Sequence, residues 1–247
     1  MTGATTTRAA IIVIGNEILS GKVTDSNSGF LARELRRMGV SLERIVVIPD
    51  AIEVIATTVR GAAGEFDVVF TSGGVGPTHD DLTIAGVAEA FDRPVVRHPR
   101  LLAAIERFAG DSPAAAMLKM AEVPEGAELV GDDRDVFPTV RIDNVYVLPG
   151  VPEIFEAKVL ALGERFRSTP FHLCQVYVSA YETAIAEYLD ATLAAFPELL
   201  LGSYPKLSHP EYRVRLTLES KDERYLENAL EDLVARMPAG FIVKIER

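Results

Sequence analysis

The chain has 247 residues, of which 48% are hydrophobic, and its formal net charge is -11 at pH 7. These values are typical of a globular protein with one large domain, or with one domain and a small appendage. A chain this acidic is not expected to bind nucleic acid, because neutralising phosphates requires a basic surface. Its single cysteine, Cys174, excludes an intrachain disulfide and a thiolate metal cluster.

Short apolar runs alternate with amphipathic helical patterns over the first two-thirds of the chain. The first run, residues 9–14, is too short for a signal sequence or a membrane span, so we expect a cytoplasmic protein with no membrane contact. Because parallel strands joined by helical crossovers place helices on both faces of a sheet, the order predicts an α/β domain with a mainly parallel sheet. Strands are predicted at 10–14, 44–48, 67–70 and 144–148, and helices at 28–38, 52–59, 82–91, 99–108, 113–121 and 154–162.

A glycine-rich segment, residues 71–83, follows the third predicted strand and leads into a helix. Its glycines let the backbone approach a ligand closely, its threonine hydroxyl can donate to a phosphate oxygen, and the helix N-terminus attracts anions. Two adjacent carboxylates, Asp80 and Asp81, would repel a bare anion, so they favour a divalent cation between themselves and the phosphates. The phosphate-binding candidates are Gly73, Gly74, Gly76 and Thr78.

The acidic side chains have a simpler interpretation as helix N-caps. The two adjacent aspartates cannot both cap one helix, which leaves one of them available for another task. Asp50 follows the second strand, where capping is the commoner role, but strand ends meet at one edge of a sheet, so it could share a cation with Asp81. Glu17 and Asn27 are turn residues that either face solvent or line the cleft, and Lys119 either faces solvent or reaches a phosphate.

The last third of the chain begins after a boundary at residues 165–170. Strands are predicted at 175–179, 212–218 and 241–243, helices at 182–196 and 226–234, and an extended run at 199–205. A compact α+β unit of about 80 residues is large enough to fold by itself. We therefore expect two domains, residues 1–167 and 168–247.

Five segments of the first two-thirds form a combined pattern, at residues 15–21, 25–27, 49–50, 73–83 and 148–153. Together they resemble the molybdopterin-binding (MoaB/MogA-like) domain, and more closely the N-terminal part of the competence-damage-inducible CinA family. The chain is still more similar to the molybdopterin-binding-like domain of eukaryotic FAD synthase. That likeness extends over nearly the whole chain through residues 119–124, 137–138, 144–146, 201–205 and 214–220.

The resemblance implies a three-layer αβα domain with a mainly parallel sheet, usually oligomeric, followed here by a small α+β domain. CinA-type domains are associated with metal-dependent hydrolysis of ADP-ribose, and the FAD synthase domain with hydrolysis of FAD. Related molybdopterin adenylyltransferases have aspartates at positions that match Asp50 and Asp81, but Asp80 stands where they carry an arginine, which disfavours adenylyl transfer. Residues 117–121 and the acidic stretch 132–135 depart from the CinA pattern, so a different ligand specificity is expected.

These observations predict metal-dependent hydrolysis of a nucleotide pyrophosphate of the FAD or ADP-ribose type. Asp50, Asp80 and Asp81 would position a divalent metal ion (Mg, Mn or Co) with Asp50 and Asp81 as ligands, and Pro149 and Gly150 would line the cleft. One alternative is a non-catalytic protein that binds molybdopterin or a molybdenum-cofactor precursor, and another is a molybdopterin adenylyltransferase. A homo-oligomer, dimer or trimer, is expected with a small-molecule pterin or nucleotide diphosphate ligand.

Overall fold

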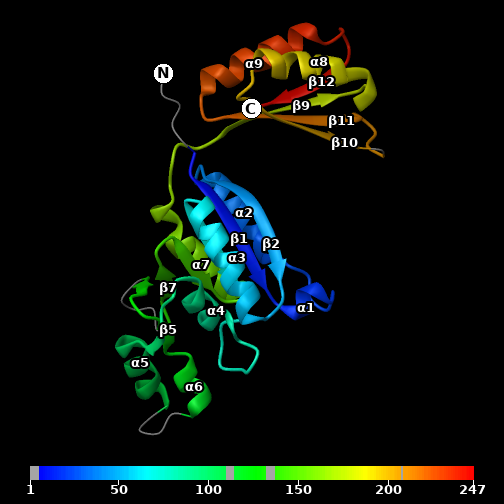
Figure 1. Cartoon of the computed structure of the whole chain (residues 1–247). Coiled ribbons are helices and arrows are strands. Elements are labelled where there is room, and N and C mark those ends of the chain that lie inside the picture. The colour runs from blue at the N-terminus through cyan, green and yellow to red at the C-terminus, as the bar shows by residue number, and fades with distance from the viewer. Residues whose placement is uncertain (1–5, 110–113, 132–136, 207) are drawn as a thin grey trace. The chain divides into compact units, whose positions relative to one another are not determined.

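The computed structural model describes residues 6–109, 114–131, 137–206 and 208–247 (Figure 1). The acidic stretch at 132–135 therefore lies outside the described residues. Contacts divide the chain into two compact units, Met1–Ser168 and Thr169–Arg247. Each helix in the described part of the chain is too short or too polar to cross a membrane.

The first unit follows the alternating strand and helix order that the apolar runs predict. Its strands are β1 (Arg8–Ile14), β2 (Ser41–Ile48), β3 (Val68–Ser72), β4 (Val95–Arg97), β5 (Glu122–Pro124), β6 (Glu128–Val130), β7 (Thr139–Ile142) and β8 (Val145–Leu148). Its helices are α1 (Asn16–Leu19), α2 (Asn27–Arg37), α3 (Ile52–Glu65), α4 (Thr83–Ala90), α5 (Pro99–Ala109), α6 (Ala115–Lys119) and α7 (Pro152–Leu162), followed by a 3₁₀ turn at Gly163–Arg165.

The main sheet has the strand order β2-β1-β3-β8-β7-β6. The first four strands are parallel, as the sequence predicts, and β7 and β6 add an antiparallel edge. A separate antiparallel pair, β4 and β5, lies in the stretch between α4 and β6. The sequence pattern does not predict β4, β5, β6 and β7, because strands of three or four residues are too short to show a period of their own.

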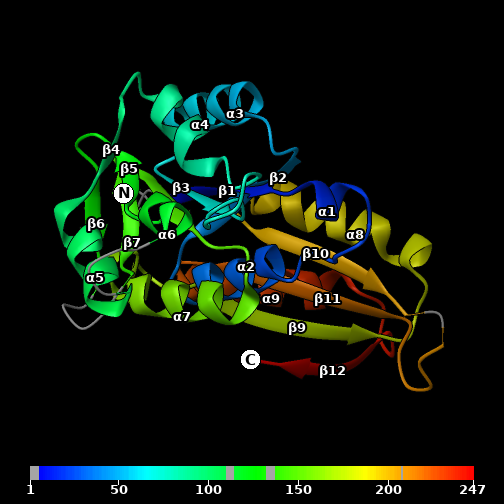
Figure 2. The ribbon, with the colours of Figure 1, turned by 90° about the horizontal axis from the view of Figure 1, so that it is seen from below.

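Helices cover both faces of the main sheet (Figure 2). Alternate side chains of β1 and β3 point to opposite faces, as the period of a strand requires. Ile12 and Val69 pack with residues of α3 and α4, whereas Ile11 and Phe70 pack with residues of α2 and α7. The first unit therefore has three layers, helices on each side of one sheet, with a hydrophobic core on each face of the sheet. This αβα arrangement confirms the predicted fold class.

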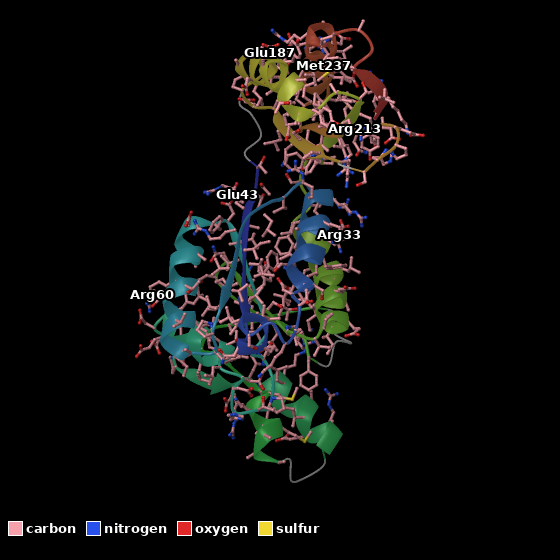
Figure 3. The ribbon with its side chains drawn as sticks, turned by 90° about the vertical axis from the view of Figure 1, so that its right-hand side faces the viewer. Arg33, Glu43, Arg60, Glu187, Arg213 and Met237 are labelled. Atoms are coloured by element: carbon pink, nitrogen blue, oxygen red, sulfur yellow. The ribbon has the colours of Figure 1, made fainter. Side chains whose placement is uncertain are left out.

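Charged side chains lie outside these layers (Figure 3). Arg60 on α3 and Arg33 on α2 point away from the sheet on opposite sides of the unit. The outer faces of the helices are therefore polar, while the sheet between them supplies the apolar core.

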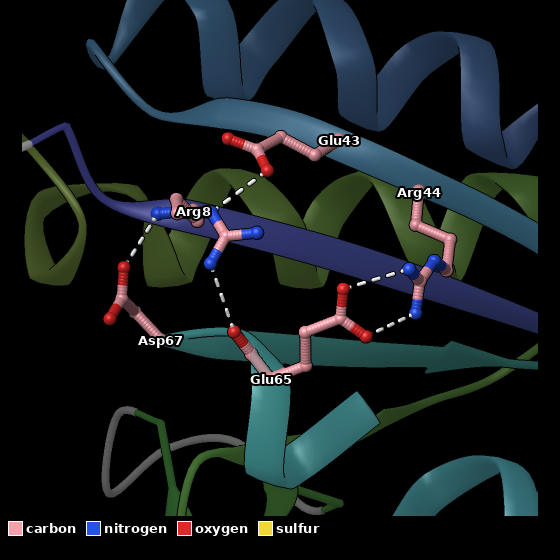
Figure 4. A network of polar contacts seen from close by, with 5 residues as sticks. All are labelled: Arg8, Glu43, Arg44, Glu65 and Asp67. Atoms are coloured by element: carbon pink, nitrogen blue, oxygen red, sulfur yellow. Dashed lines mark hydrogen bonds and ion pairs between the residues drawn. The ribbon is translucent and has the colours of Figure 1, made fainter. Parts of the chain in front are cut away.

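An ion-pair network closes the amino ends of the parallel strands (Figure 4). The Arg8 backbone N–H donates to Asp67 Oδ2 at 2.7 Å, and its guanidinium donates to Glu43 Oε2 at 2.8 Å. Arg44 binds both carboxylate oxygens of Glu65, at 2.5 and 2.8 Å. The network therefore joins the starts of β1 and β2 to the end of α3 and to Asp67, just before β3.

The second unit contains β9 (His172–Val178), α8 (Glu182–Ala195), β10 (Leu200–Pro205), β11 (Val214–Ser220), α9 (Glu223–Arg236) and β12 (Ile242–Glu246). Its sheet has the order β10-β11-β9-β12, and all neighbouring strands are antiparallel. This βαββαβ arrangement is ferredoxin-like. Its core is separate from those of the first unit and includes Val176, Leu216, Ile185 and Leu230.

Candidate active site

The glycine-rich loop begins where β3 ends and leads into α4. Gly73 has a φ of 99° and Gly74 a φ of 61°, in the left-handed region that favours glycine. A Cβ atom on Gly73 would lie 2.2 Å from the carbonyl oxygen of Ile14, and one on Gly74 would lie 2.4 Å from Thr83 Oγ1. Both positions therefore require glycine for backbone conformation and for space.

Thr83, at the start of α4, fastens the loop to the helix. Its hydroxyl donates to the carbonyl oxygen of Gly73 at 2.7 Å, and its backbone N–H donates to that of Gly74 at 3.0 Å. Thr83 is fully buried. Thr83 was not among the site residues predicted from the sequence, although it is the last residue of the glycine-rich segment.

A tight turn carries the two adjacent carboxylates. Asp81 Oδ2 accepts hydrogen bonds from the backbone N–H of Thr78, at 2.7 Å, and from the Thr78 hydroxyl. The ammonium group of Lys119, on α6, donates a hydrogen bond to the carbonyl oxygen of Thr78. The lysine thus reaches the loop itself, and Asp81 shapes the turn without capping α4, whose N-cap is Leu82.

Asp80 is exposed on the same turn and stays ionised. The Thr78 hydroxyl lowers the pKa of Asp80 most, its own backbone N–H lowers it further, and the charges of His79 and Lys119 add to this, while loss of solvent around the carboxylate opposes the shift. His79 Nδ1 lies 3.8 Å from Asp80 Oδ1. The turn therefore presents negative charge at neutral pH.

Asn27 joins three segments at the carboxyl edge of the sheet. Its amide nitrogen donates to Ser72 Oγ and to the carbonyl oxygen of Gly150, both at 2.9 Å. Its amide oxygen is buried without a hydrogen-bond partner in the described chain. A Cβ atom on Gly150 would lie 3.1 Å from the Cα of Gly73, so the turn after β8 packs directly on the glycine-rich loop.

Asp50 and Glu17 lie at the ends of β2 and β1. Asp50 Oδ2 accepts a hydrogen bond from the backbone N–H of Asn16 at 2.8 Å, and the N-cap of α3 is Ala51, without a side-chain cap. Glu17 is exposed, and its carboxylate folds over Gly15. Within the described ranges, no group of three or more His, Cys, Asp or Glu side chains could hold a metal ion, so the three aspartates form no such cluster.

A cavity of 590 Å³ opens beside the glycine-rich loop. Of the candidates from the sequence, it is lined by Gly74, Gly76, Asp81, Lys119 and Pro149. The others, namely Glu17, Asn27, Asp50, Gly73, Thr78, Asp80 and Gly150, lie outside its lining.

The remaining wall of the cavity is mostly apolar and comes from distant parts of the first unit. Phe137 and Pro138 precede β7, Val151 and Ile154 belong to the segment around the start of α7, and Lys158 follows one turn later. Lys158 donates to the carbonyl oxygen of Phe137. This wall was not predicted from the sequence, because no local pattern shows that these segments face the loop.

Several of the large apolar side chains that are exposed on the first unit lie in this lining, although others, such as Leu19 and Leu160, do not. Those in the lining are Val75, Val95, Met120, Phe137, Val151 and Ile154. Single exposed apolar residues are ordinary, whereas a group of them around one concave space indicates a binding site.

The family comparison assigns both units of the chain. Residues 10–166 match the probable molybdopterin binding domain, and residues 170–246 match the FAD synthase middle domain. A protein of Archaeoglobus fulgidus is 36% identical over 89% of this chain and 93% of its own length.

Two further relatives carry descriptive names. A probable FAD synthase of Caenorhabditis elegans is 34% identical over 95% of this chain, which spans only 50% of that protein. The crystal structure of the protein CinA, of unknown function, from Thermoplasma acidophilum superposes with a TM-score of 0.60 at 30% identity, over 65% of this chain and 98% of that one. The predicted resemblance is thereby confirmed, and the chain belongs to the family of the probable molybdopterin binding domain.

Proposed function

We propose that this protein hydrolyses a nucleotide pyrophosphate of the FAD or ADP-ribose type with the help of a divalent metal ion. The observation that carries the proposal is the position of the acidic glycine-rich turn at the rim of an apolar cavity. A cavity of 590 Å³ lies within the ordinary range of small-molecule sites. An aromatic base or ring would occupy the cavity, and the diphosphate would lie against the turn.

The backbone of the loop supplies donors for phosphate oxygens. The N–H groups of Gly74, Val75 and Gly76 donate no hydrogen bond to the residues that the structure describes. Unpaired N–H groups on consecutive residues form an anion-binding concavity. Lys119 adds positive charge next to the turn and holds its backbone in place.

The donor set of the turn fits a magnesium-type ion. Asp81 Oδ1 accepts no hydrogen bond from the described chain, and Asp80 is exposed and ionised. Such ions are commonly held by one or two carboxylates, with phosphate oxygens and water completing the shell. Asp80 and Asp81 would hold the ion, while Asp50, which forms no cluster of three with them in the described chain, binds the backbone N–H of Asn16. When bound, the ion would neutralise the diphosphate and activate a water molecule.

The reaction is a simple exchange of bonds. The oxygen of a water molecule adds to one phosphorus of the anhydride, and the P–O bond to the bridging oxygen breaks. AMP and the second monophosphate leave. We place this reaction in the cytoplasm, as the short N-terminal apolar run predicts, and in a homo-oligomer, as the family resemblance implies.

The test is release of AMP from FAD or ADP-ribose by the purified protein with Mg, Mn or Co ions. Asp81→Asn keeps the shape of the side chain and removes its charge, so kcat/KM is expected to fall at least about 100-fold, equivalent to about 2.7 kcal/mol. Asp143→Asn is the matched control at the amino end of β8, where a φ of 48° suits either residue. Equal activity of Asp81→Asn and the wild type would refute the proposal.

A second candidate is binding of molybdopterin or a molybdenum-cofactor precursor without turnover, which the apolar cavity also favours. Molybdopterin bound tightly, with no AMP from either dinucleotide, would select this alternative. Adenylyl transfer is tested in the same assay with molybdopterin and ATP. Release of pyrophosphate together with an adenylylated pterin would identify it.

A further inference from the structure

One face of the sheet in the second unit is not covered by the helices of that unit. Helices α8 and α9 lie on the other face (Figure 1). Alternate residues of the two central strands, among them Val176 and Leu216, are buried under these helices. The residues between them, such as Tyr177 and Arg215, are only half-buried and point to the opposite side.

The strand registers arrange this open face in three rows across the sheet. The basic row is Tyr204, Arg215, Tyr177 and Lys244; the middle row is Gly202, Thr217, Gln175 and Glu246; the third row is Leu200, Glu219 and Leu173. Along β10, β11 and β9, the basic row and the third row are thus separated by four residues, with the middle row between them.

The open face combines exposed apolar surface with an unpaired cation. Leu173, Leu200 and Tyr204 remain 44%, 47% and 46% exposed. The guanidinium of Arg215 lies 5.2 Å from the ring centre of Tyr204, its Nε is buried without a hydrogen-bond partner, and no carboxylate of the described chain forms an ion pair with it. Exposed apolar residues grouped around a charge are typical of an interaction surface.

The pattern of the open face is complementary to itself. A two-fold axis along the middle row brings the basic row of one copy opposite the third row of the other. Tyr204 then faces Leu200, Tyr177 faces Leu173, and Arg215 faces Glu219, each contact occurring twice. We propose that the open face binds the open face of a second copy of this chain in this orientation.

Like charges just beyond the two ends of β11 limit the contact between the two copies to the strands. Arg213 and Lys221, just beyond the two ends of β11, would face each other with like charge. Each lies over a ring of its own chain instead, Arg213 at 5.7 Å from Tyr181 and Lys221 at 5.1 Å from Phe171. Glu246, at the edge of the middle row, accepts a hydrogen bond from Tyr177 at 2.7 Å and pairs with Lys244, which offsets its charge.

The size of the face sets the expected strength of association. Four strands of about seven residues cover a flat area of roughly 400 Å², which is small for a stable interface. The dimer is therefore expected to dissociate in the micromolar range, and sedimentation must be followed from low micromolar to submillimolar concentration of the full chain.

Charge reversal tests the proposed orientation. Arg215→Glu places a second carboxylate opposite Glu219, and Glu219→Arg places two arginines opposite each other, so each single variant is expected to sediment at half the mass of the wild type. A mixture of the two single variants is expected to regain the full mass, because every facing pair is then opposite in charge. Within one chain the two residues are separated by four positions along a strand, so the recovery cannot come from an internal ion pair.

A cross-link tests the position of the axis. Packed sheets lie about 10 Å apart, which is too far for a direct disulfide between facing strands. Thr217 lies on the axis, so Thr217→Cys is expected to be joined between copies by a short bismaleimide reagent, while Cys174 stays buried. Val234→Cys, exposed on α9, is the control and is expected to remain unlinked.

Circular dichroism of each variant checks the fold. If the folded variants sediment like the wild type, if mixing fails to restore the mass, or if Thr217→Cys does not cross-link, the proposed dimer is wrong, and the face is covered in another way.

Discussion

The two ends of the parallel sheet in the first unit differ in whether their polar groups have partners within the chain. At the amino ends, Arg8 and Arg44 bind Glu43, Glu65 and Asp67, so each charge has a partner within the chain (Figure 4). At the carboxyl ends, the glycine-rich loop leaves N–H groups unpaired beside a cavity, and the amide oxygen of Asn27 is buried without a partner in the described chain.

This difference indicates that the carboxyl ends can bind a ligand, whereas the charged network at the amino ends only stabilises the fold. The charges at the amino ends already have partners within the chain. The unpaired N–H donors and the apolar cavity at the carboxyl ends can still bind a ligand. Ligands of open α/β sheets bind at the carboxyl ends of the strands for this reason. Changes at the carboxyl ends should therefore affect ligand binding as well as stability, and changes at the amino ends should affect stability alone.

The largest effect is expected from Gly73→Ala. The new methyl group would lie 2.2 Å from the carbonyl oxygen of Ile14 at a φ of 99°, so the loop and β1 must separate. We expect a loss of about 3 kcal/mol in the free energy of unfolding, measured with urea. Gly61→Ala, on α3 with open space around it, is the control and should gain up to about 1 kcal/mol. Equal stability of the two variants would contradict the close approach of loop and strand.

Asn27→Ala and Asn144→Ala form a matched pair across the two ends. The side-chain amide of Asn144 also donates two hydrogen bonds, to the carbonyl oxygens of Ala63 at 3.0 Å and Phe66 at 2.8 Å. Each variant is expected to lose about 2 kcal/mol of stability, because two hydrogen bonds that are buried or partly buried are lost.

The two variants should differ in ligand binding. Asn27→Ala frees Gly150 and Ser72 beside the loop, so the Kd for a nucleotide diphosphate should rise several-fold in calorimetric titration. Asn144→Ala should leave that Kd unchanged. A rise in Kd for both variants would show that the two ends are not functionally separate.

Glu65→Gln should have a small effect on stability and none on activity. The ion pair of Glu65 with Arg44 is nearly half exposed, at 43% and 45% of the two side chains, so we expect a loss of about 0.5 kcal/mol. The loss should shrink in high salt. A larger loss that is insensitive to salt, or a change in kcat/KM, would contradict the assignment of this end to stability.

The smallest effect concerns the titration of Asp80. Its pKa is lowered below the ordinary 3.8, chiefly by the Thr78 hydroxyl, so the stabilising contact persists above the ordinary pKa and is lost as the pH falls through the lowered value. Thr78→Val removes the hydroxyl and should raise the pKa of Asp80 towards 3.8 in a carbon NMR titration. The pKa of Glu164, lowered by its bond to Arg167, should stay the same. An unchanged midpoint for Asp80 would exclude Thr78 as the cause.

Local patterns in the sequence predicted much of the fold. Local patterns extend over only a few residues, so they can be recognised without a structure. Examples are the apolar run of β1, the amphipathic pattern of α2 and the glycines after β3. The same patterns placed Asp80 and Asp81 on a turn before a helix, where the structure has them. The short strands β4 to β7 left no such signal, and the sheet therefore has an antiparallel edge that was not expected.

The sequence by itself determined the layer architecture and the acidic glycine-rich turn, because strand and helix periods and glycine spacing are properties of neighbouring residues, and its motifs carried the resemblance to the family. Only the tertiary structure decided that Asp50 binds the backbone of Asn16, that Lys119 holds Thr78, and that Phe137 and Ile154 complete a cavity beside the turn. These contacts join residues that are far apart along the chain. Their partners are selected by the packing of the whole unit, which no local pattern records.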